Sequence, residues 1–180
     1  SRLGELEDVL RGIEAAESAG LAPLKLNMVV MRGLNDDEVV DFARLTIERD
    51  WCVRFIEMMR VGAWQRASDD RWREDFISLD EVRSQIEEEL GELELVGEGE
   101  ITSGGPARHW RLPGARGTLG FITPVSAHFC PSCNRVRLTA DGRLRPCLLS
   151  DLEFDLRAPL REGASLAELK VLLVEAIAAK

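Results

Sequence analysis

The fold class of this protein is decided by the stretch LKLNMVV at residues 24–30, which predicts a strand. Leucine, methionine and valine occupy its even positions and therefore share one face, because side chains alternate along a strand. Lys25 and Asn27 lie on the other face. In a closed sheet this face would line a polar cavity, whereas at an open edge the same side chains would reach solvent.

The flanking segments repeat the pattern of helix followed by strand. An apolar stripe over residues 3–20 predicts a helix, and Asn35 predicts the start of a second helix with Glu38 in the capping-box position. Residues 52–58 predict a second strand, in which Arg54 is expected on the polar face or at an open edge. Short connections between such units are typical of α/β folds with a parallel sheet.

The remainder of the chain has shorter periods and more turns. Residues 62–75 predict a polar surface excursion, Cys52 is expected to pack as a small apolar residue, and His109 is expected at the surface. The further predicted elements are a helix at 78–90, strands at 93–96, 107–112 and 118–122, a hairpin of 135–139 with 144–148, and a helix at 165–180. Two βα units cannot close a barrel, so we expect the chain to be the C-terminal part of a longer protein.

Composition excludes several classes of function. The 180 residues are 45% hydrophobic and 31% charged, with a net charge of −9, which argues against general nucleic-acid binding. No apolar run reaches the roughly 20 residues of a membrane helix, and no secretory pattern is present, so we expect a cytoplasmic, reducing environment. Nine acids and one arginine at residues 80–100 predict a solvated face, with an interaction scaffold as an alternative.

Three cysteines carry the clearest chemical signal. Cys130, Cys133 and Cys147 have the spacing C-x2-C-x13-C, which suits a soft metal centre with one open coordination position. Arg135 and Arg137 place positive charge beside that position and favour a small anionic ligand. An exposed hairpin of arginines is the simpler alternative.

A zinc site is the competing interpretation of the same cysteines. His128 could complete a Cys3His set around zinc, giving a structural module without catalysis. Its position two residues before Cys130 would strain a shared turn. The metal content of the protein separates the two interpretations.

The cysteine motif also carries a family resemblance. FITPVS at 121–126 and FCPSCNRVRLTADGRLRPCL at 129–148, with KLNMVVMRGLND at 25–36 and RFIEMM at 54–59, resemble the molybdenum cofactor biosynthesis protein A family. These are the GTP 3′,8-cyclases of the radical S-adenosylmethionine superfamily. The resemblance covers most of residues 1–150, although 63–115 carries little of it, and corresponds to the C-terminal portion of the family.

The resemblance implies a fold and a division of the chain. The fold is α/β: the C-terminal βα units of a partial TIM-type barrel, followed by a mostly antiparallel α+β cluster-binding domain. The implied parts are the end of the barrel at 1–62, a variable excursion with an acidic helix and strands at 63–115, a [4Fe–4S] and GTP-binding hairpin at 116–150, and a C-terminal tail helix at 151–180.

The resemblance also implies the reaction. GTP would be converted to (8S)-3′,8-cyclo-7,8-dihydroguanosine 5′-triphosphate in molybdenum cofactor (molybdopterin) biosynthesis, starting from a radical that an N-terminal [4Fe–4S] cluster makes from S-adenosylmethionine. A second [4Fe–4S] cluster would be held by Cys130, Cys133 and Cys147, with its open iron on the guanine. GTP, the N-terminal half of the barrel, a second copy of the chain and the downstream cyclic pyranopterin monophosphate synthase are the implied partners, with no nucleic acid and no membrane.

Site residues carry over by direct match to the family's motifs. Met59 would lie against S-adenosylmethionine. The residues implied to bind GTP are Lys25, Arg54, Arg135, Val136 and Arg137.

Three features of the family are absent from these 180 residues. They are the C-x3-C-x2-C motif of the N-terminal cluster, the S-adenosylmethionine-binding glycines and serine, and the terminal Gly-Gly. We therefore expect a fragment that has no cyclase activity by itself.

Overall fold

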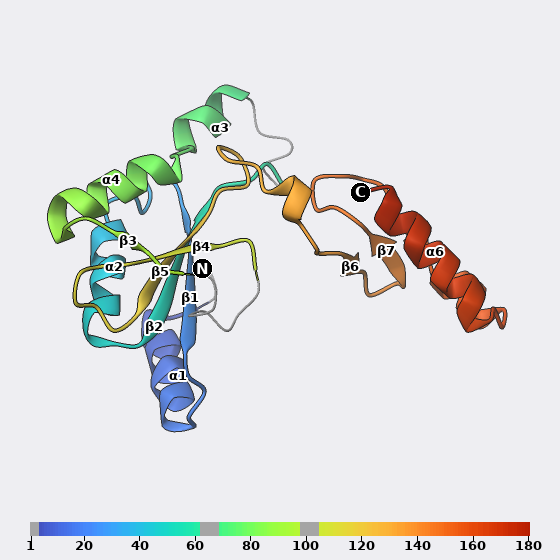
Figure 1. The fold of residues 1–180 in the computed structure, drawn as a ribbon, viewed down its shortest axis with the longest axis horizontal. Helices are drawn as coiled ribbons and strands as arrows, with labels where there is room; N and C mark the ends of the chain where they lie inside the picture. Colours follow the sequence, from blue (N-terminus) through green and yellow to red (C-terminus); the bar gives the residue numbers. More distant parts are fainter. Residues whose placement is uncertain (1–3, 62–68, 98–104) are drawn as a thin grey trace. The chain divides into compact units, whose positions relative to one another are not determined.

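The computed structural model describes residues 4–61, 69–97 and 105–180, which fall into two compact units (Figure 1). We call the first the sheet unit; its described residues are 4–59, 69–97 and 105–129. The second, the cysteine unit, comprises residues 60–61 and 130–180 among those described. Residues 62–68, the first part of the predicted excursion, lie outside the described residues.

The sheet unit confirms the predicted α/β class. In chain order its elements are α1 (Leu6–Ser18), β1 (Leu24–Val30), α2 (Val39–Glu48), β2 (Trp51–Glu57), α3 (Asp69–Asp75), α4 (Leu79–Leu90), β3 (Glu94–Leu95), β4 (Arg108–Arg111) and β5 (Thr118–Ile122). The strands form one sheet in the order β1-β2-β5-β4-β3. β1, β2 and β5 are parallel, and β4 and β3 continue the sheet antiparallel.

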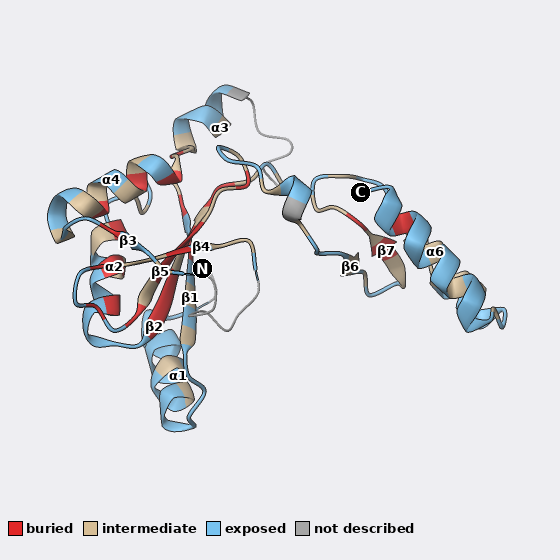
Figure 2. Cartoon of the chain, in the orientation of Figure 1, coloured by how far each residue is buried: buried red, intermediate tan, exposed pale blue. Residues whose placement is uncertain are grey.

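The two faces of this sheet differ sharply. Helices α2 and α4 pack on one face and bury a core with Val53, Phe55 and Leu119 at its centre (Figures 1 and 2). The alternation in β1 is as predicted: its even-numbered residues are buried or half-buried, and its odd-numbered residues are exposed. We call the second side the open face, and its strand residues include Lys25 and Arg54.

Several element boundaries depart from the sequence prediction. Asn35 does not cap α2: its side chain accepts from the Met31 N–H (2.8 Å) and donates to the Val29 carbonyl (3.0 Å), so it closes the loop after β1. The helix begins only at Val39, without a side-chain cap. Ser78, in contrast, caps α4 as predicted, since its hydroxyl accepts from Glu81 N–H. Part of the predicted excursion forms the helix α3.

The cysteine unit is built on a small antiparallel sheet. Its elements are the 3-10 turn η2 (Cys130–Ser132), β6 (Arg137–Leu138), β7 (Arg143–Arg145), β8 (Phe154–Asp155), α5 (Arg157–Arg161) and α6 (Leu166–Ala178). The predicted hairpin forms but is shorter than expected, whereas β8 and α5 were not predicted. Leu144 is buried, and α6, whose predicted helix is confirmed by a Ser165–Glu168 capping box, packs on β7.

The strands of the two units form separate sheets. The described strands form a mixed sheet and a separate antiparallel sheet, so the TIM-type barrel and the four-part division of the chain remain predictions. Among the described residues, no helix combines enough length and apolar character to cross a membrane.

Candidate functional site

The cysteine unit presents two of its thiols on one short turn. Cys130 begins the 3-10 turn, and its carbonyl accepts from the Cys133 N–H at 3.2 Å. Cys130 is exposed, while Cys133 and Cys147 are half-buried, and none of them forms a disulfide. The C-x2-C spacing therefore places Cys130 and Cys133 on one compact turn with free thiols, an arrangement that metal-binding cysteines need.

Lys180 is a residue of this region that the sequence did not reveal. Its ammonium group lies 3.2 Å from Cys133 Sγ and donates to the carbonyls of Cys133 (2.5 Å) and Arg135 (2.8 Å). Hydrogen bonding from the Arg135 N–H, together with Lys180, lowers the pKa of the Cys133 thiol to about 7. A thiol of lowered pKa gives the thiolate that binds metal. No sequence pattern marked Lys180, because its contact spans 47 positions.

The chemistry of the three cysteines suits a metal centre, but their positions in the structure do not form one. Among the described residues, no three His, Cys, Asp or Glu side chains gather closely enough to hold a metal ion. The structure thus leaves the site of Cys130, Cys133 and Cys147 a prediction. The donor set itself, three free thiols, suits an iron–sulfur cluster.

The arginines after the cysteines are arranged differently from the prediction. Both were expected on one strand, but Arg135 precedes β6 and only Arg137 lies within it. Arg137 pairs in register with Arg145 across the hairpin, so two cations face each other. Like charges in directly opposed positions destabilise a sheet unless they are neutralised. Val136, between the two predicted arginines, is exposed.

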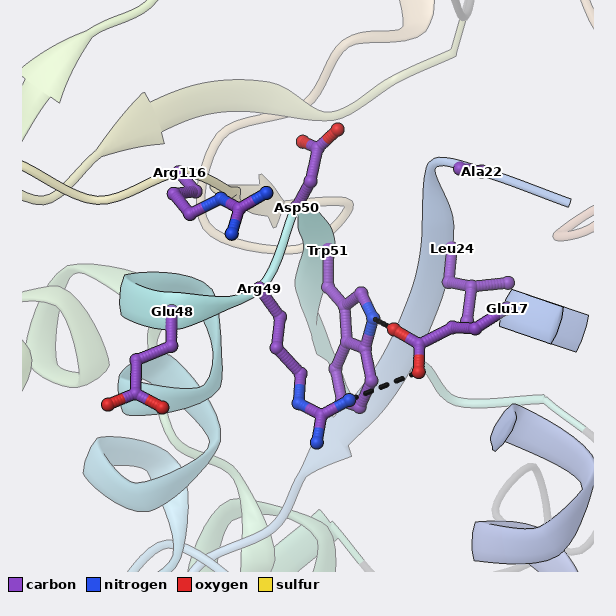
Figure 3. A pocket seen from close by; sticks show the side chains of 8 residues that line it. All are labelled: Glu17, Ala22, Leu24, Glu48, Arg49, Asp50, Trp51 and Arg116. Atoms are coloured by element: carbon purple, nitrogen blue, oxygen red, sulfur yellow. Dashed lines mark hydrogen bonds and ion pairs between the residues drawn. The ribbon is translucent and has the colours of Figure 1, made fainter. Parts of the chain in front are cut away.

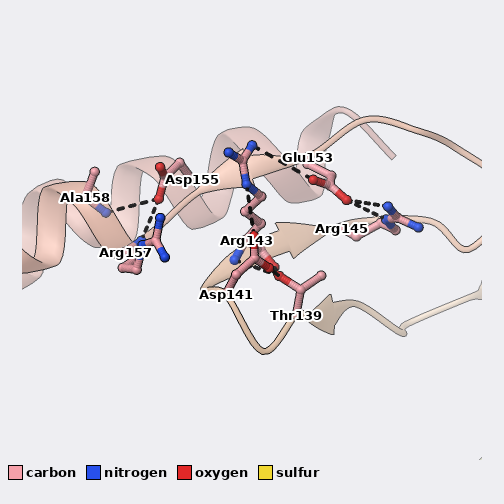
Figure 4. A network of polar contacts seen from close by, with 8 residues as sticks. All are labelled: Thr139, Asp141, Arg143, Arg145, Glu153, Asp155, Arg157 and Ala158. Carbon is pink, nitrogen blue, oxygen red and sulfur yellow. Dashed lines mark hydrogen bonds and ion pairs between the residues drawn. The ribbon is translucent and has the colours of Figure 1, made fainter.

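Acidic partners neutralise some of these arginines (Figure 4). Arg145 Nε donates to Glu153 at 3.1 Å, and Arg143 lies 3.3 Å from Asp141 and 3.9 Å from Glu153. Arg137 forms no ion pair with a described residue. Of the two opposed cations on the hairpin, Arg137 is therefore the one still available for an outside anion.

The open face of the sheet unit holds the remaining predicted GTP residues. Lys25 is exposed on β1 and Arg54 is half-buried on β2, and the parallel register places Asn27 beside Arg54. His109, on β4, shares this face and is 9% exposed, so the expectation of a surface histidine was wrong. Its Nδ1 lies 3.7 Å from the Cys52 sulfur, and Cys52 is buried as predicted.

A buried carboxylate at the end of β2 was also missed. Glu57 is fully buried and accepts hydrogen bonds from the backbone N–H groups of Val125 (2.9 Å), Ser126 (2.9 Å) and Leu79 (3.3 Å), and from the Ser126 hydroxyl. It thereby ties together β2, the start of α4 and the loop after β5. Met59, the residue matched to S-adenosylmethionine binding, follows two positions later and is half-buried.

A hollow of about 410 Å³ lies at the amino ends of β1 and β2 (Figure 3). Glu17 of α1 accepts there from Trp51 Nε1 (2.6 Å) and Arg49 (3.1 Å), and the Arg49 guanidinium stacks 4.7 Å from the Trp51 ring. These contacts fasten α1 to the sheet. None of the residues predicted to bind GTP lines this hollow.

Comparison with known proteins gives a consistent result. The family model described as Molybdenum Cofactor Synthesis C matches residues 51–180. The chain is 49% identical over 180 residues to a protein of Heliobacterium modesticaldum named GTP 3′,8-cyclase, covering all of this chain and 53% of the relative. A protein of the same name from Thermodesulfovibrio yellowstonii is 46% identical over 179 residues, covering 98% of this chain and 52% of the relative. The chain thus spans about half the length of the curated relatives it matches.

Proposed function

We propose that this chain, which belongs to the Molybdenum Cofactor Synthesis C family, is the C-terminal part of a GTP 3′,8-cyclase. The observation that carries the proposal is the 49% identity that extends over all 180 residues to a relative of that name. Its reaction would be the one implied by the sequence resemblance, the cyclisation of GTP in molybdenum cofactor synthesis. The other half of such a protein would contribute the S-adenosylmethionine cluster, so we expect no cyclase activity from these residues alone.

Cys130, Cys133 and Cys147 would hold a [4Fe–4S] cluster in this function. Support comes from their free thiols, from the shared turn of the first two, and from the lowered pKa of Cys133. Three protein ligands leave one iron open, and the bound cluster would supply a Lewis-acidic position for the guanine base. Lys180 would hold the Cys133–Arg135 turn in place through its two carbonyl contacts.

The cationic residues would bind the substrate. Arg135, Val136 and Arg137 follow the cysteine turn, and a guanidinium such as that of Arg137 suits phosphate through charge-assisted hydrogen bonds. Lys25 and Arg54 would contact GTP from the open face, and Met59 would lie against S-adenosylmethionine. The support for Lys25 and Arg137 is that neither forms an ion pair with a described residue.

Reconstitution tests this proposal directly. The purified chain is incubated anaerobically with iron and sulfide, and iron, sulfide and zinc are then measured in the wild type and in C130S, C133S and C147S. We expect about four irons per chain, with loss in each variant, as a cube ligated by three cysteines requires. In the full-length protein, with the cluster reduced to its paramagnetic state, electron-nuclear double resonance with nitrogen-15 GTP should then show coupling to a guanine nitrogen. Zinc bound in place of iron, with His128 as the fourth ligand, would overturn the proposal.

A further inference from the structure

A row of side chains crosses the open face of the sheet unit. The strand registers align Asn27 of β1 with Arg54 of β2, Arg54 with Gly120 of β5, and Gly120 with His109 of β4. Residues paired in this way project to the same face, and neighbouring strands lie about 4.8 Å apart. His109 therefore belongs to the face that carries Lys25 and Arg54, although it comes from a distant part of the chain.

Gly120 allows its two neighbours in this row, Arg54 and His109, to approach each other. A Cβ at that position would lie 3.0 Å from Arg54 Cγ and 3.4 Å from His109 Cε1. The Arg54 stem and the His109 ring consequently converge over the glycine from opposite sides. Any larger residue would have to push at least one of them aside.

Charge around His109 is mostly positive. Lys25 approaches from β1, Arg54 from β2 and Arg111 from β4, while Glu94, opposite Arg111 on β3, is the acid in that register. Burial, followed by the charges of Arg54 and Lys25, lowers the pKa of the imidazole. Cys52 lies against Nδ1, and Nε2 has no hydrogen-bond partner among the described residues. A neutral imidazole whose Nδ1 contacts Cys52 can gain a proton at Nε2 when an anion binds nearby.

We propose that His109 is a further substrate-binding residue, which joins Lys25 and Arg54 in contacting the polyphosphate of the nucleotide and takes up a proton when this anion binds. The inference rests on the proposed function, because that function supplies a nucleoside triphosphate as the ligand. A polyphosphate at Lys25 and Arg54 offsets their repulsion of the imidazolium. The protonated ring then donates from Nε2 to a phosphate oxygen, and charge-assisted bonds of this kind are strong.

Nuclear magnetic resonance can follow this proton, because the chain contains only two histidines. The imidazole nitrogens of the labelled chain are titrated between about pH 5 and 8 with and without inorganic tripolyphosphate. His109 is assigned with H109Q, and H128Q is the matched control. We expect the anion to raise the pKa of His109 by about one pH unit, the size typical of a nearby opposite charge. The ring resonances of His128 should not respond to the anion.

Affinity provides the second measurement. H109Q should weaken tripolyphosphate binding about tenfold at pH 6, as loss of a hydrogen bond to a charged group predicts, and much less at pH 8. Changes in protonation of the probe itself affect wild type and variant equally and cancel in this comparison. Amide spectra of H109Q establish that the variant is folded.

The outcomes are distinguishable. If K25A and R54A weaken binding but the anion leaves the pKa of His109 unchanged, the role of His109 is refuted. Polyphosphate binding by Lys25 and Arg54 is then still supported. If the wild type binds no tripolyphosphate, or K25A changes nothing, the open face is not a polyphosphate site and the inference fails with it. The cluster assignment is judged separately, by iron content in the cysteine variants.

Discussion

Removing the Glu57 carboxylate should strongly destabilise the sheet unit. Four donors converge on it: three backbone N–H groups and the Ser126 hydroxyl. Glu57 is 0% exposed, so water cannot replace the lost acceptor in an otherwise unchanged structure. A buried donor left without a partner costs about 1–3 kcal/mol, whereas Ser126 is exposed and can turn its two donors toward water. Because the loop can relax, we expect E57A to lower the free energy of unfolding by about 4 kcal/mol.

The matched variant E57Q keeps the shape and separates charge from volume. Its amide oxygen can take the place of Oε2, which accepts from Val125 and Ser126, and its NH2 group can donate to the Ser126 hydroxyl. Only the Leu79 N–H, at the amino end of α4, would then face another donor. The charge at that helix end is lost as well. We expect E57Q to cost about 2 kcal/mol, half the effect of E57A.

Urea unfolding followed by circular dichroism measures both variants. The unfolding midpoint should fall in the order wild type, E57Q, E57A, with an unchanged denaturant dependence if the native state keeps its compactness. S126A, which removes a single donor, should cost about 1 kcal/mol and combine non-additively with E57A. An E57A variant as stable as the wild type, or E57Q as damaging as E57A, would refute the reasoning from hydrogen-bond satisfaction.

Three further expectations follow from the geometry. G117A should lower the free energy of unfolding by about 3 kcal/mol in urea titrations, because its Cβ would lie 2.2 Å from a backbone oxygen; wild-type stability would contradict this. Iodoacetamide should alkylate Cys133 with a half-maximal rate near pH 7, because the lowered pKa increases the thiolate fraction. K180M should move this midpoint to higher pH, and an unchanged midpoint would exclude Lys180 as a cause of the lowered pKa. In the reconstituted protein, R137A should weaken GTP binding by about 1.5–3 kcal/mol in calorimetry, whereas R143A, whose partners are Asp141 and Glu153, should have little effect.

Strand positions and side-chain parity were the most predictable features of the fold. The alternation in β1 correctly placed Lys25 on the less buried face, because period-two patterning depends only on local geometry. Arg54 was expected on the polar face of its strand or at an open edge, and the register places it on the same face as Lys25, next to Asn27. The Asn35 cap failed because an asparagine can satisfy several backbone groups, and here the groups of the preceding loop were nearer.

Residues that act through distant contacts were not predictable. Glu57 occupies a strand position of the kind usually filled by an apolar side chain, and its donors lie 22 to 69 residues away. His109 was expected at the surface because the pairing of β4 with β5, which buries it, cannot be read from a short four-residue strand. In both cases the sequence shows the polar group but not the partner that makes its burial tolerable.

A count of charges along the sequence does not show which arginines of the basic hairpin are neutralised by acids from elsewhere in the chain. Residues 135–145 appear strongly basic, yet Glu153, outside that stretch, neutralises Arg145 and approaches Arg143. Acids outnumber lysines and arginines in this chain by 32 to 23, so most cations can find a partner within it. Lys25 and Arg137 have none among the described residues. The sequence resemblance implies a GTP-binding role for each of them, which remains a prediction. Each is a cation whose counter-charge an external polyanion could supply.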